Sequence, residues 1–378
     1  MDDTGGISVS VTLEIWNPDM TYRYPSMAGE FEGIKFSSIM YGGFAAFTAS
    51  ACRRPWRHYP EFALGNIIQV RSRHQIVWSG RISAPTIDTS DLRIDLEADG
   101  PIERLKSRLT LTSLAAGTCS GNWITTNLIG DSDLGYLAGA ISDGYRFPTD
   151  GQGADFSPAT YYADAVEQLN SVNGYRYGFF SPPISCVLRA RYFDFAPLST
   201  TPDYYLDMAD CQSQIQYTTE GIENYLRVTY SPNGSTYKYF WHPATGPDPA
   251  SAALYGRRDG RLEVPGVVSR AHAEAVAAIA LAWRKTLRPA TDIVATRITD
   301  VTGATVPLPE VQPGRVLHIR GLNPGEFTLS EAQAVNQLCT WPIVLTEPDL
   351  DMGTITLSPG GLSSTMDRIM ARMEMRAR

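Results

Sequence analysis

Two short stretches of this chain share one pattern: GNIIQVR at Gly65–Arg71 and GRVLHIR at Gly314–Arg320. Each begins with glycine, carries aliphatic residues at its third, fourth and sixth places, and ends with arginine. Glycine favours the tight turn that starts a strand, and β-branched or aliphatic residues favour the strand itself. The echo therefore predicts the same strand in two related β-barrels. Chance is the alternative, because a turn glycine before an apolar strand is common in β proteins.

The residues that follow each stretch agree with this interpretation. Val77–Ile82 (VWSGRI) predicts the hairpin return after the first stretch, and Phe327–Leu329 (FTL) predicts the return after the second.

Composition restricts the class of protein. A length of 378 residues suggests two or three domains, and 32 glycines, 25 prolines and 19 tyrosines favour strands and turns. The net charge of −8, with a pI of about 5.2, argues against a nucleic-acid-binding role, which requires cations that displace counterions from phosphates.

Targeting signals and cysteine chemistry are weak in this sequence. No run of 18 apolar residues occurs, and the first residues (MDDTGG) are acidic where a signal peptide would be basic and then apolar. We expect a soluble protein made in the cytoplasm, without membrane insertion. The five cysteines are widely separated, which predicts neither a disulfide framework nor a metal clamp, and we expect them to be small buried hydrophobic residues.

The predicted fold class is mainly β with an α+β insertion. Residues 1–115 form the first predicted barrel, because period-two alternation and turn glycines mark six short strands there. These strands are expected at 8–16, 31–40, 44–50, 66–71, 75–78 and 92–98.

Residues 116–215 form the predicted insertion. Ser157 and Pro158 open an expected helix there, and 175–180 and 186–192 are an expected strand pair.

Residues 216–346 form the second predicted barrel, with a helix at 270–287 whose apolar side is expected to pack across the barrel. Residues 347–378 are a C-terminal extension.

A search for reactive motifs predicts no enzyme. Gly117–Gly121 (GTCSG) fits the outline of a nucleophile elbow, but the preceding residues are weak strand formers, so a plain turn is favoured. Asp131–Asp133 and Asp349–Asp351 lack the rest of a calcium loop, and the five histidines lack ligand spacing. We therefore expect no catalytic residue, no cofactor and no metal site.

Two clusters are candidates for contacts with partner proteins. Arg53–Tyr59 (RRPWRHY) mixes cations with aromatic residues, as a single-strand binder would, but on an acidic chain an exposed hairpin or a contact with an acidic subunit is favoured. The second cluster is a short basic helix near the C-terminus with methionines suited to docking. The candidate residues are Arg53, Arg54, Trp56, Arg57, Met366, Ile369, Met370 and Met373.

An ordered series of motifs in the third quarter resembles a known family. The series runs IENYLRVTY at 222–230, LYGRR at 254–258, the alanine-rich helix at 270–287, and then PL at 307–308 with VQPG at 311–314. In this order the motifs resemble the baseplate hub proteins of long-tailed and contractile-tailed bacteriophages. The resemblance covers residues 220–345, and the first hundred residues more loosely.

This resemblance implies two barrels per subunit, similar to a tail-tube protein duplicated in one chain, and a ring of three subunits that continues a sixfold tube. It implies a structural role in the virion tail tip, assembly in the host cytoplasm, and a distal tail protein, a tape measure protein and tail fibre or tip proteins as partners. DNA would be only passing cargo, and the acidic chain suits such a conduit.

Two other functions stay open at this point. One is a distal tail protein, a hexamer with a single barrel per subunit. The other is a carbohydrate-binding tail or receptor-binding protein, which the many Tyr and Trp residues suggest.

Overall fold

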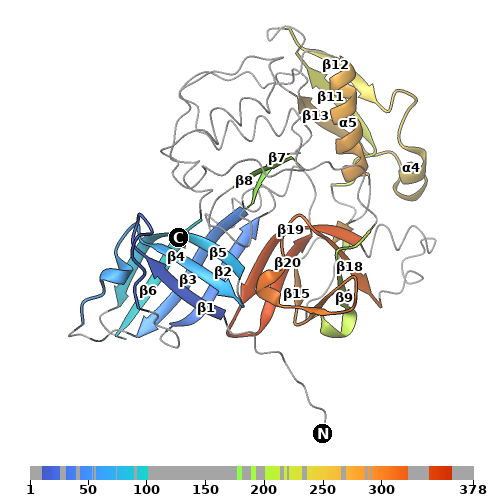
Figure 1. The fold of residues 1–378 in the computed structure, drawn as a ribbon. Helices are drawn as coiled ribbons and strands as arrows, with labels where there is room; N and C mark the ends of the chain where they lie inside the picture. Colours follow the sequence, from blue (N-terminus) through green and yellow to red (C-terminus); the bar gives the residue numbers. More distant parts are fainter. Residues whose placement is uncertain are drawn as a thin grey trace.

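The computed structural model shows a mainly β protein made of three parts (Figure 1). An N-terminal unit and a C-terminal unit lie side by side, and a small α/β module lies beyond the C-terminal unit. The structure describes residues 11–25, 31–39, 43–52, 54, 57–73, 75–88, 92–100, 177–180, 189–192, 201–212, 217–218, 221–231, 236–264, 270–285, 288–289, 292–321 and 340–359.

The N-terminal unit is an antiparallel, curled sheet with the strand order β1-β4-β5-β6-β3-β2. In β1 and β6, buried residues alternate with more exposed ones, which turns one face of each strand toward a common core, as the sequence predicted. The strands are β1 (Val11–Trp16), β2 (Phe31–Ile39), β3 (Gly43–Cys52), β4 (Ile67–Ser72), β5 (Gln75–Asp88) and β6 (Arg93–Asp99).

Trp78 on β5 is the centre of this core. Its side chain is fully buried, and its ring lies 5.1 Å from the ring of Phe47 and 6.3 Å from that of Phe44. Gly80 is required next to it, because a β-carbon at residue 80 would collide with the Trp78 ring and with the Asp99 carbonyl. The glycine therefore allows β5 and β6 to approach over the indole.

The C-terminal unit is built from strands that are far apart in the sequence. β18 lies between β9 and β19, and β20 pairs with both β19 and β15. Its core contains Trp341, Ile343 and Leu317, among others. The strands are β9 (Tyr204–Asp207), β15 (Ile293–Ala295), β16 (Ile298–Asp300), β17 (Thr305–Val306), β18 (Val316–Arg320), β19 (Thr340–Asp349) and β20 (Thr354–Pro359).

One strand pair joins the two units into a continuous sheet. β2 pairs antiparallel with β19, with Ile39 opposite Leu345 and Ser38 opposite Thr346. In the described residues, the N-terminal sheet thus continues into the C-terminal unit at β2, where the sequence predicted two separate barrels. Lys35 also forms an ion pair of 2.9 Å with Asp349.

The two stretches with the shared pattern start in the same way. Gly65 and Gly314 have φ angles of +83° and +84°. The N–H of Gly65 donates to the Ile82 carbonyl at 2.9 Å, and that of Gly314 donates to the Ile343 carbonyl at 2.7 Å. In return, the N–H of Ile82 donates to the Asn66 carbonyl and the N–H of Ile343 donates to the Arg315 carbonyl, both at 2.8 Å.

β4 and β18, the strands that follow the two glycines, have similar neighbouring strands on one side and different ones on the other. β4 and β18 each pair antiparallel with the next long strand, β5 or β19. On the other side β4 has antiparallel β1, whereas β18 has parallel β9. The expected return at Phe327–Leu329 lies outside the described residues, and β19 is the strand that pairs with β18.

The similarity extends further toward the N-terminus than the heptapeptides show. A proline stands five residues before each glycine and a glutamate four residues before it: Pro60 and Glu61 before Gly65, and Pro309 and Glu310 before Gly314. Each pair belongs to a one-turn 3₁₀ helix, η1 (Pro60–Phe62) or η5 (Leu308–Glu310).

The α/β module, residues 217–289, has a sheet of its own with the order β12-β11-β13. β11 pairs antiparallel with β12 and parallel with β13. The short strands β10 (Tyr217–Thr218) and β14 (Arg288–Pro289) pair where the chain enters and leaves the module. Its other elements are β11 (Tyr225–Tyr230), β12 (Lys238–His242), α4 (Pro249–Tyr255), β13 (Asp259–Val264) and α5 (Arg270–Arg284).

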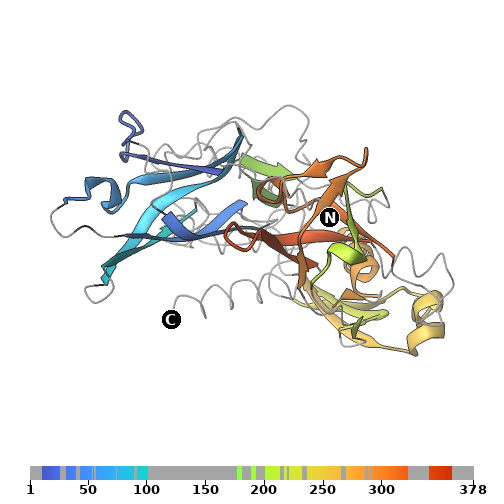
Figure 2. The same ribbon diagram turned by 90° about the horizontal axis from the view of Figure 1, so that it is seen from below.

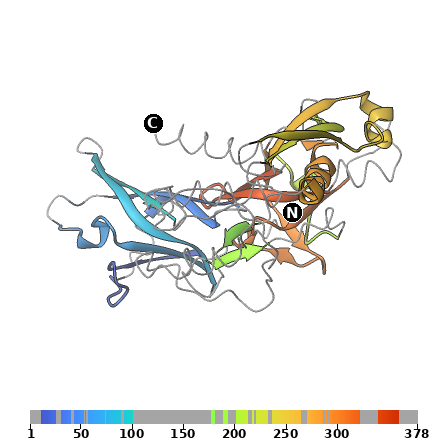
Figure 3. The same cartoon turned by 90° about the horizontal axis from the view of Figure 1, so that it is seen from above.

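The helix expected at 270–287 is α5, but its place differs from the prediction. It packs on β11 and β12 through Ala273, Val276, Ala277, Ala280 and Leu281, which recur at helical spacing, and not across a barrel. Residues 216–346, predicted as one barrel, therefore do not share one sheet. Figures 2 and 3 show the module and the N-terminal unit at opposite ends of the molecule.

Only part of the predicted insertion is described. β7 (Tyr177–Phe180) and β8 (Arg189–Tyr192) form an antiparallel pair, as expected. The predicted helix at Ser157 lies outside the described residues, as does the extension beyond residue 359.

We expect Trp78→Ala to lower the free energy of unfolding by about 3–5 kcal/mol, because it removes a fully buried indole from the core. Urea unfolding followed by circular dichroism measures this change. Leu64→Ala is the control, since the Leu64 side chain is 67% exposed and its loss should change stability by less than about 0.5 kcal/mol. Equal effects from the two variants would contradict the assigned core.

The two turn glycines should respond alike to substitution. Gly65→Ala and Gly314→Ala each force a side chain into a positive-φ conformation, which should lower stability by about 1–2 kcal/mol. The same urea titration measures both. Asparagine at either position should lower stability less, because it tolerates this region better than alanine. A neutral Gly314→Ala would show that the two turns are not alike.

Candidate functional site

The arginine-rich loop before β4 contains an internal ion pair. Arg57 lies 2.8 Å from Glu61, whose side chain is 7% exposed, and its guanidinium lies over the Tyr59 ring at 5.0 Å. Arg57 thus neutralises a buried carboxylate and is not a simple docking cation. Arg54 is exposed, and its backbone N–H donates to the Tyr59 hydroxyl at 2.6 Å. Arg53 and Trp56 lie outside the described residues.

The second predicted contact cluster cannot be placed. Met366, Ile369, Met370 and Met373 all lie outside the described residues.

The most distinctive described surface is the face of the module sheet that α5 does not cover. On β11, Leu226, Val228 and Tyr230 are buried on the helix side, so Tyr225 and Arg227 lie on the opposite side. The strand register places Tyr239 and Trp241 of β12 on that same side. We call this surface, with Arg257 above it, the open face.

Rings and guanidinium groups are ordered on the open face. Tyr225 and Trp241 stack with their ring centroids 4.6 Å apart, and Arg257 lies 4.9 Å from the Tyr225 centroid. Arg227 lies 4.5 Å from the centroid of Tyr239, a residue that is 63% exposed. Such cation–π contacts hold the arginine side chains against the rings.

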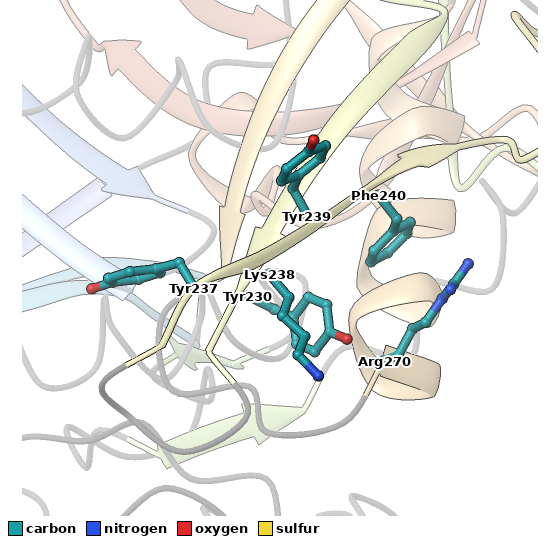
Figure 4. Close-up of a pocket in the computed structure, with 6 residues that line it drawn as sticks. All are labelled: Tyr230, Tyr237, Lys238, Tyr239, Phe240 and Arg270. Carbon is teal, nitrogen blue, oxygen red and sulfur yellow. The ribbon is translucent and has the colours of Figure 1, made fainter.

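A pocket of about 520 Å³ adjoins the open face at the start of β12 (Figure 4). Figure 4 shows Phe240 pointing toward α5, where Arg270 begins the helix, and Tyr239 pointing to the other side of the strand. Lys238 and Arg270 make this pocket cationic, and Tyr237 beside it is 70% exposed. None of the six lining residues was among the contact residues predicted from the sequence.

The module is basic although the chain is acidic. Residues 217–289 contain nine Lys or Arg and six Asp or Glu, whereas the whole chain carries a net charge of −8. The excess acid therefore lies outside the module. An anionic surface is therefore attracted to the module and repelled by the rest of the chain.

Internal polar contacts hold the module in shape. Asn224 is fully buried; its amide nitrogen donates to the Gly256 carbonyl and its oxygen accepts from the Arg258 N–H, both at 2.8 Å. Burial alone would raise the pKa of Asp248, but hydrogen bonds from Lys285 and from the Ser251 N–H lower it below its usual value. Asp248 therefore stays ionised as the N-cap of α4.

The described residues offer little reactive chemistry. No group of three or more His, Cys, Asp or Glu side chains within them could hold a metal ion. Burial lowers the pKa of His242, and burial followed by the charge of Arg320 lowers that of His318, which favours the neutral ring in both. Cys52 is exposed, contrary to the expectation of buried cysteines. No helix in the described ranges has the length and apolar character to span a bilayer.

Comparison with known proteins finds similarity in structure alone. No family model and no curated protein matches the sequence. The prophage tail protein gp18 from Listeria monocytogenes EGD-e aligns with a TM-score of 0.61 and 12% identity, over 96% of this chain and 98% of that one.

Two further tail proteins align over almost their full length. A tail protein from Neisseria meningitidis MC58 has a TM-score of 0.57 at 12% identity, covering 92% of this chain and 95% of its own. The 43 kDa tail protein of prophage MuSo2 from Shewanella oneidensis has a TM-score of 0.56 at 11% identity, covering 93% and 97%. The chain therefore has the fold of these phage tail proteins.

Proposed function

We propose that this chain is a structural, non-enzymatic hub protein of a bacteriophage tail tip. Three copies form a ring that continues or closes the tail tube and attaches tip proteins or fibres. The observation that carries the proposal is the fold, which matches prophage tail proteins over nearly the whole length of both chains. Similarity of fold alone does not define activity, so the proposal also depends on the repeat.

The repeat supports a subunit with two tube-like units. Both glycine-started strands open with the same pair of backbone hydrogen bonds, and the preceding Pro-Glu pairs are at the same distance from the glycine. Two such units per chain give six per trimer, which adapts a sixfold tube to a threefold tip. The parallel β9 beside β18 is the main departure from this equivalence.

In this role the protein would lie in the virion tail tip after assembly in the host cytoplasm. Its neighbours would be the distal tail protein, the tape measure protein and fibre or tip proteins, and DNA would pass without stable binding. The acidic balance outside the module supports a conduit, because a basic bore would hold phosphates.

Two alternatives have their own predictions. A distal tail protein would form a sixfold ring with one tube-like unit per subunit. A carbohydrate-binding tail protein would use exposed aromatic residues such as Tyr237 and Tyr239 to stack on sugars.

The symmetry of the ring distinguishes a hub protein from a distal tail protein. We expect native mass spectrometry of the purified chain to give a trimer, and a reconstruction of intact tails without imposed symmetry to show a threefold ring. The bore should be lined by neutral or acidic side chains. A sixfold ring of this chain would favour the distal tail protein, and a monomer in the virion would remove both.

Charge reversal in the arginine-rich loop separates docking from stability. Arg57→Glu places a second carboxylate beside Glu61 and should lower the free energy of unfolding by about 3 kcal/mol or more, because it leaves a buried charge unpaired. Arg54→Glu, at an exposed side chain, should leave stability within about 0.5 kcal/mol.

If the loop meets an acidic subunit, Arg54→Glu should nevertheless reduce the yield of complete tails. Electron microscopy of induced lysates measures this yield. Normal tails from Arg54→Glu would remove this residue from the docking surface.

A further inference from the structure

The open face has the composition of a protein interface and not of a free surface. Tyr, Trp and Arg dominate the energetic centres of interfaces, and Tyr225, Trp241 and Arg227 supply these types side by side. The stacked rings and the cation–π contacts hold the side chains in place before a partner arrives, which lowers the entropy lost on binding.

Mixed charge on this face favours a protein partner over a nucleic acid. Asp259 accepts two hydrogen bonds from Arg257, at 2.8 and 3.0 Å, and Glu263 also lies on this side of β13. Carboxylates among the arginines would repel a phosphate backbone. A protein partner can offer both signs, so that the arginines meet carboxylates while Asp259 and Glu263 meet a cation.

A complementary acidic stripe lies on β6 of the N-terminal unit. Ile94, Leu96 and Ala98 face the core, so Asp95, Glu97 and Asp99 face outward. Asp95 accepts a hydrogen bond from Ser50 at 2.6 Å, while Glu97 and Asp99 are exposed. Arg93 lies on the same side of the strand, 3.8 Å from Asp95, so this side of β6 is acidic with one cation at its end. We call Asp95, Glu97 and Asp99 the β6 stripe.

The two surfaces lie at opposite ends of one molecule, as all three ribbon views show (Figures 1, 2 and 3). They therefore cannot meet within one chain. A closed ring needs two different patches on each copy, the first of which fits the second patch of the next copy.

We propose that the open face of the module binds the β6 stripe of a second copy of this chain. This inference rests on the proposed ring and assigns one of its contacts. Where the C-terminal unit of one copy meets the N-terminal unit of the next, the adjoining module covers the outer face of that N-terminal sheet. The aromatic residues supply most of the affinity, and Arg227 and Arg261 set the register against the carboxylates.

Photocrosslinking tests the contact directly. With p-benzoylphenylalanine in place of Tyr239, irradiation of the full-length trimer should join residue 239 to a peptide containing residues 93–99 of another copy. The same group in place of Val301, which is 63% exposed in the turn between β16 and β17 of the C-terminal unit, is the control and should not reach that peptide. A crosslink from residue 239 to a peptide outside the β6 region would overturn the inference.

Affinity measurements test the chemistry. Tyr239→Ala and Arg227→Glu should each raise the concentration for half-assembly about tenfold, measured by sedimentation equilibrium, whereas Val301→Ala, at an exposed residue of the C-terminal unit, should leave it unchanged. Arg227→Glu should fold normally, because residue 227 lies opposite Arg261 in the sheet register. Raising salt from about 0.1 to 0.5 M should weaken the wild-type trimer in the same direction.

Charge exchange provides a rescue. Glu97→Lys alone should weaken assembly, and the double variant of Arg227→Glu with Glu97→Lys should return to within about threefold of the wild type, because every interface in the ring then carries the exchanged pair. Asp207→Lys, at an exposed carboxylate on β9, is the control for added positive charge and should not rescue Arg227→Glu.

The outcomes separate this inference from the proposed function. A stable trimer that neither Tyr239→Ala nor Arg227→Glu weakens would overturn the assigned contact and leave the ring intact. A chain that stays monomeric at all concentrations would overturn both. Saturable binding of a labelled single-stranded oligonucleotide to the trimer that Tyr239→Ala abolishes would assign the open face to nucleic acid and overturn the inference.

Discussion

The pairing of β2 with β19 is the constraint on which the rest of the architecture depends. β2 would otherwise be the exposed edge of the N-terminal sheet, with unpaired N–H and C=O groups open to any other strand. Pairing with β19 satisfies these groups inside the chain and sets the relation of the two units by backbone register instead of by a linker. Asp351 strengthens the junction by accepting the Gly33 N–H at 2.6 Å, and Glu310 accepts the Ser72 hydroxyl at 2.8 Å.

This junction has a consequence for assembly. Because one sheet runs through both units, the direction of the N-terminal unit determines where the C-terminal unit can meet a neighbour. Where the chain enters and leaves the module, β10 and β14 pair over only two residues each. In the proposed ring, the continuous sheet would fix the relative position of the two units, and the module would add contacts beyond them.

The sequence predicted the strands whose signal is local and missed the relations that are not. β1 and β6 alternate buried and more exposed residues, so their existence and approximate bounds follow from period-two burial. β4 and β5 are instead buried over runs of four or five consecutive residues, and β5, which was expected at 75–78, extends to Asp88. β13 alternates as well, with Gly260, Leu262 and Val264 buried, but a glycine and three charged residues obscured it. α4 has the full signals of a short helix, with N-cap Asp248, Pro249 at its first turn and Gly256 after it, and was missed because only seven residues lie between. The β2–β19 register depends on residues about 300 positions apart, which no local pattern encodes.

The candidate surfaces, too, depend on contacts that local sequence patterns do not encode. Arg57 looked like a docking cation because its partner, Glu61, is four residues away in a turn that the sequence does not predict. The sequence did not indicate the open face because its residues come from β11, β12 and the chain just before β13, which the antiparallel pairing of β11 with β12 and its parallel pairing with β13 bring together. In the proposed conduit, cations that face the DNA would hold its phosphates. The module, with nine Lys or Arg against six Asp or Glu, would therefore lie away from the bore, where its net positive charge favours contacts with acidic protein.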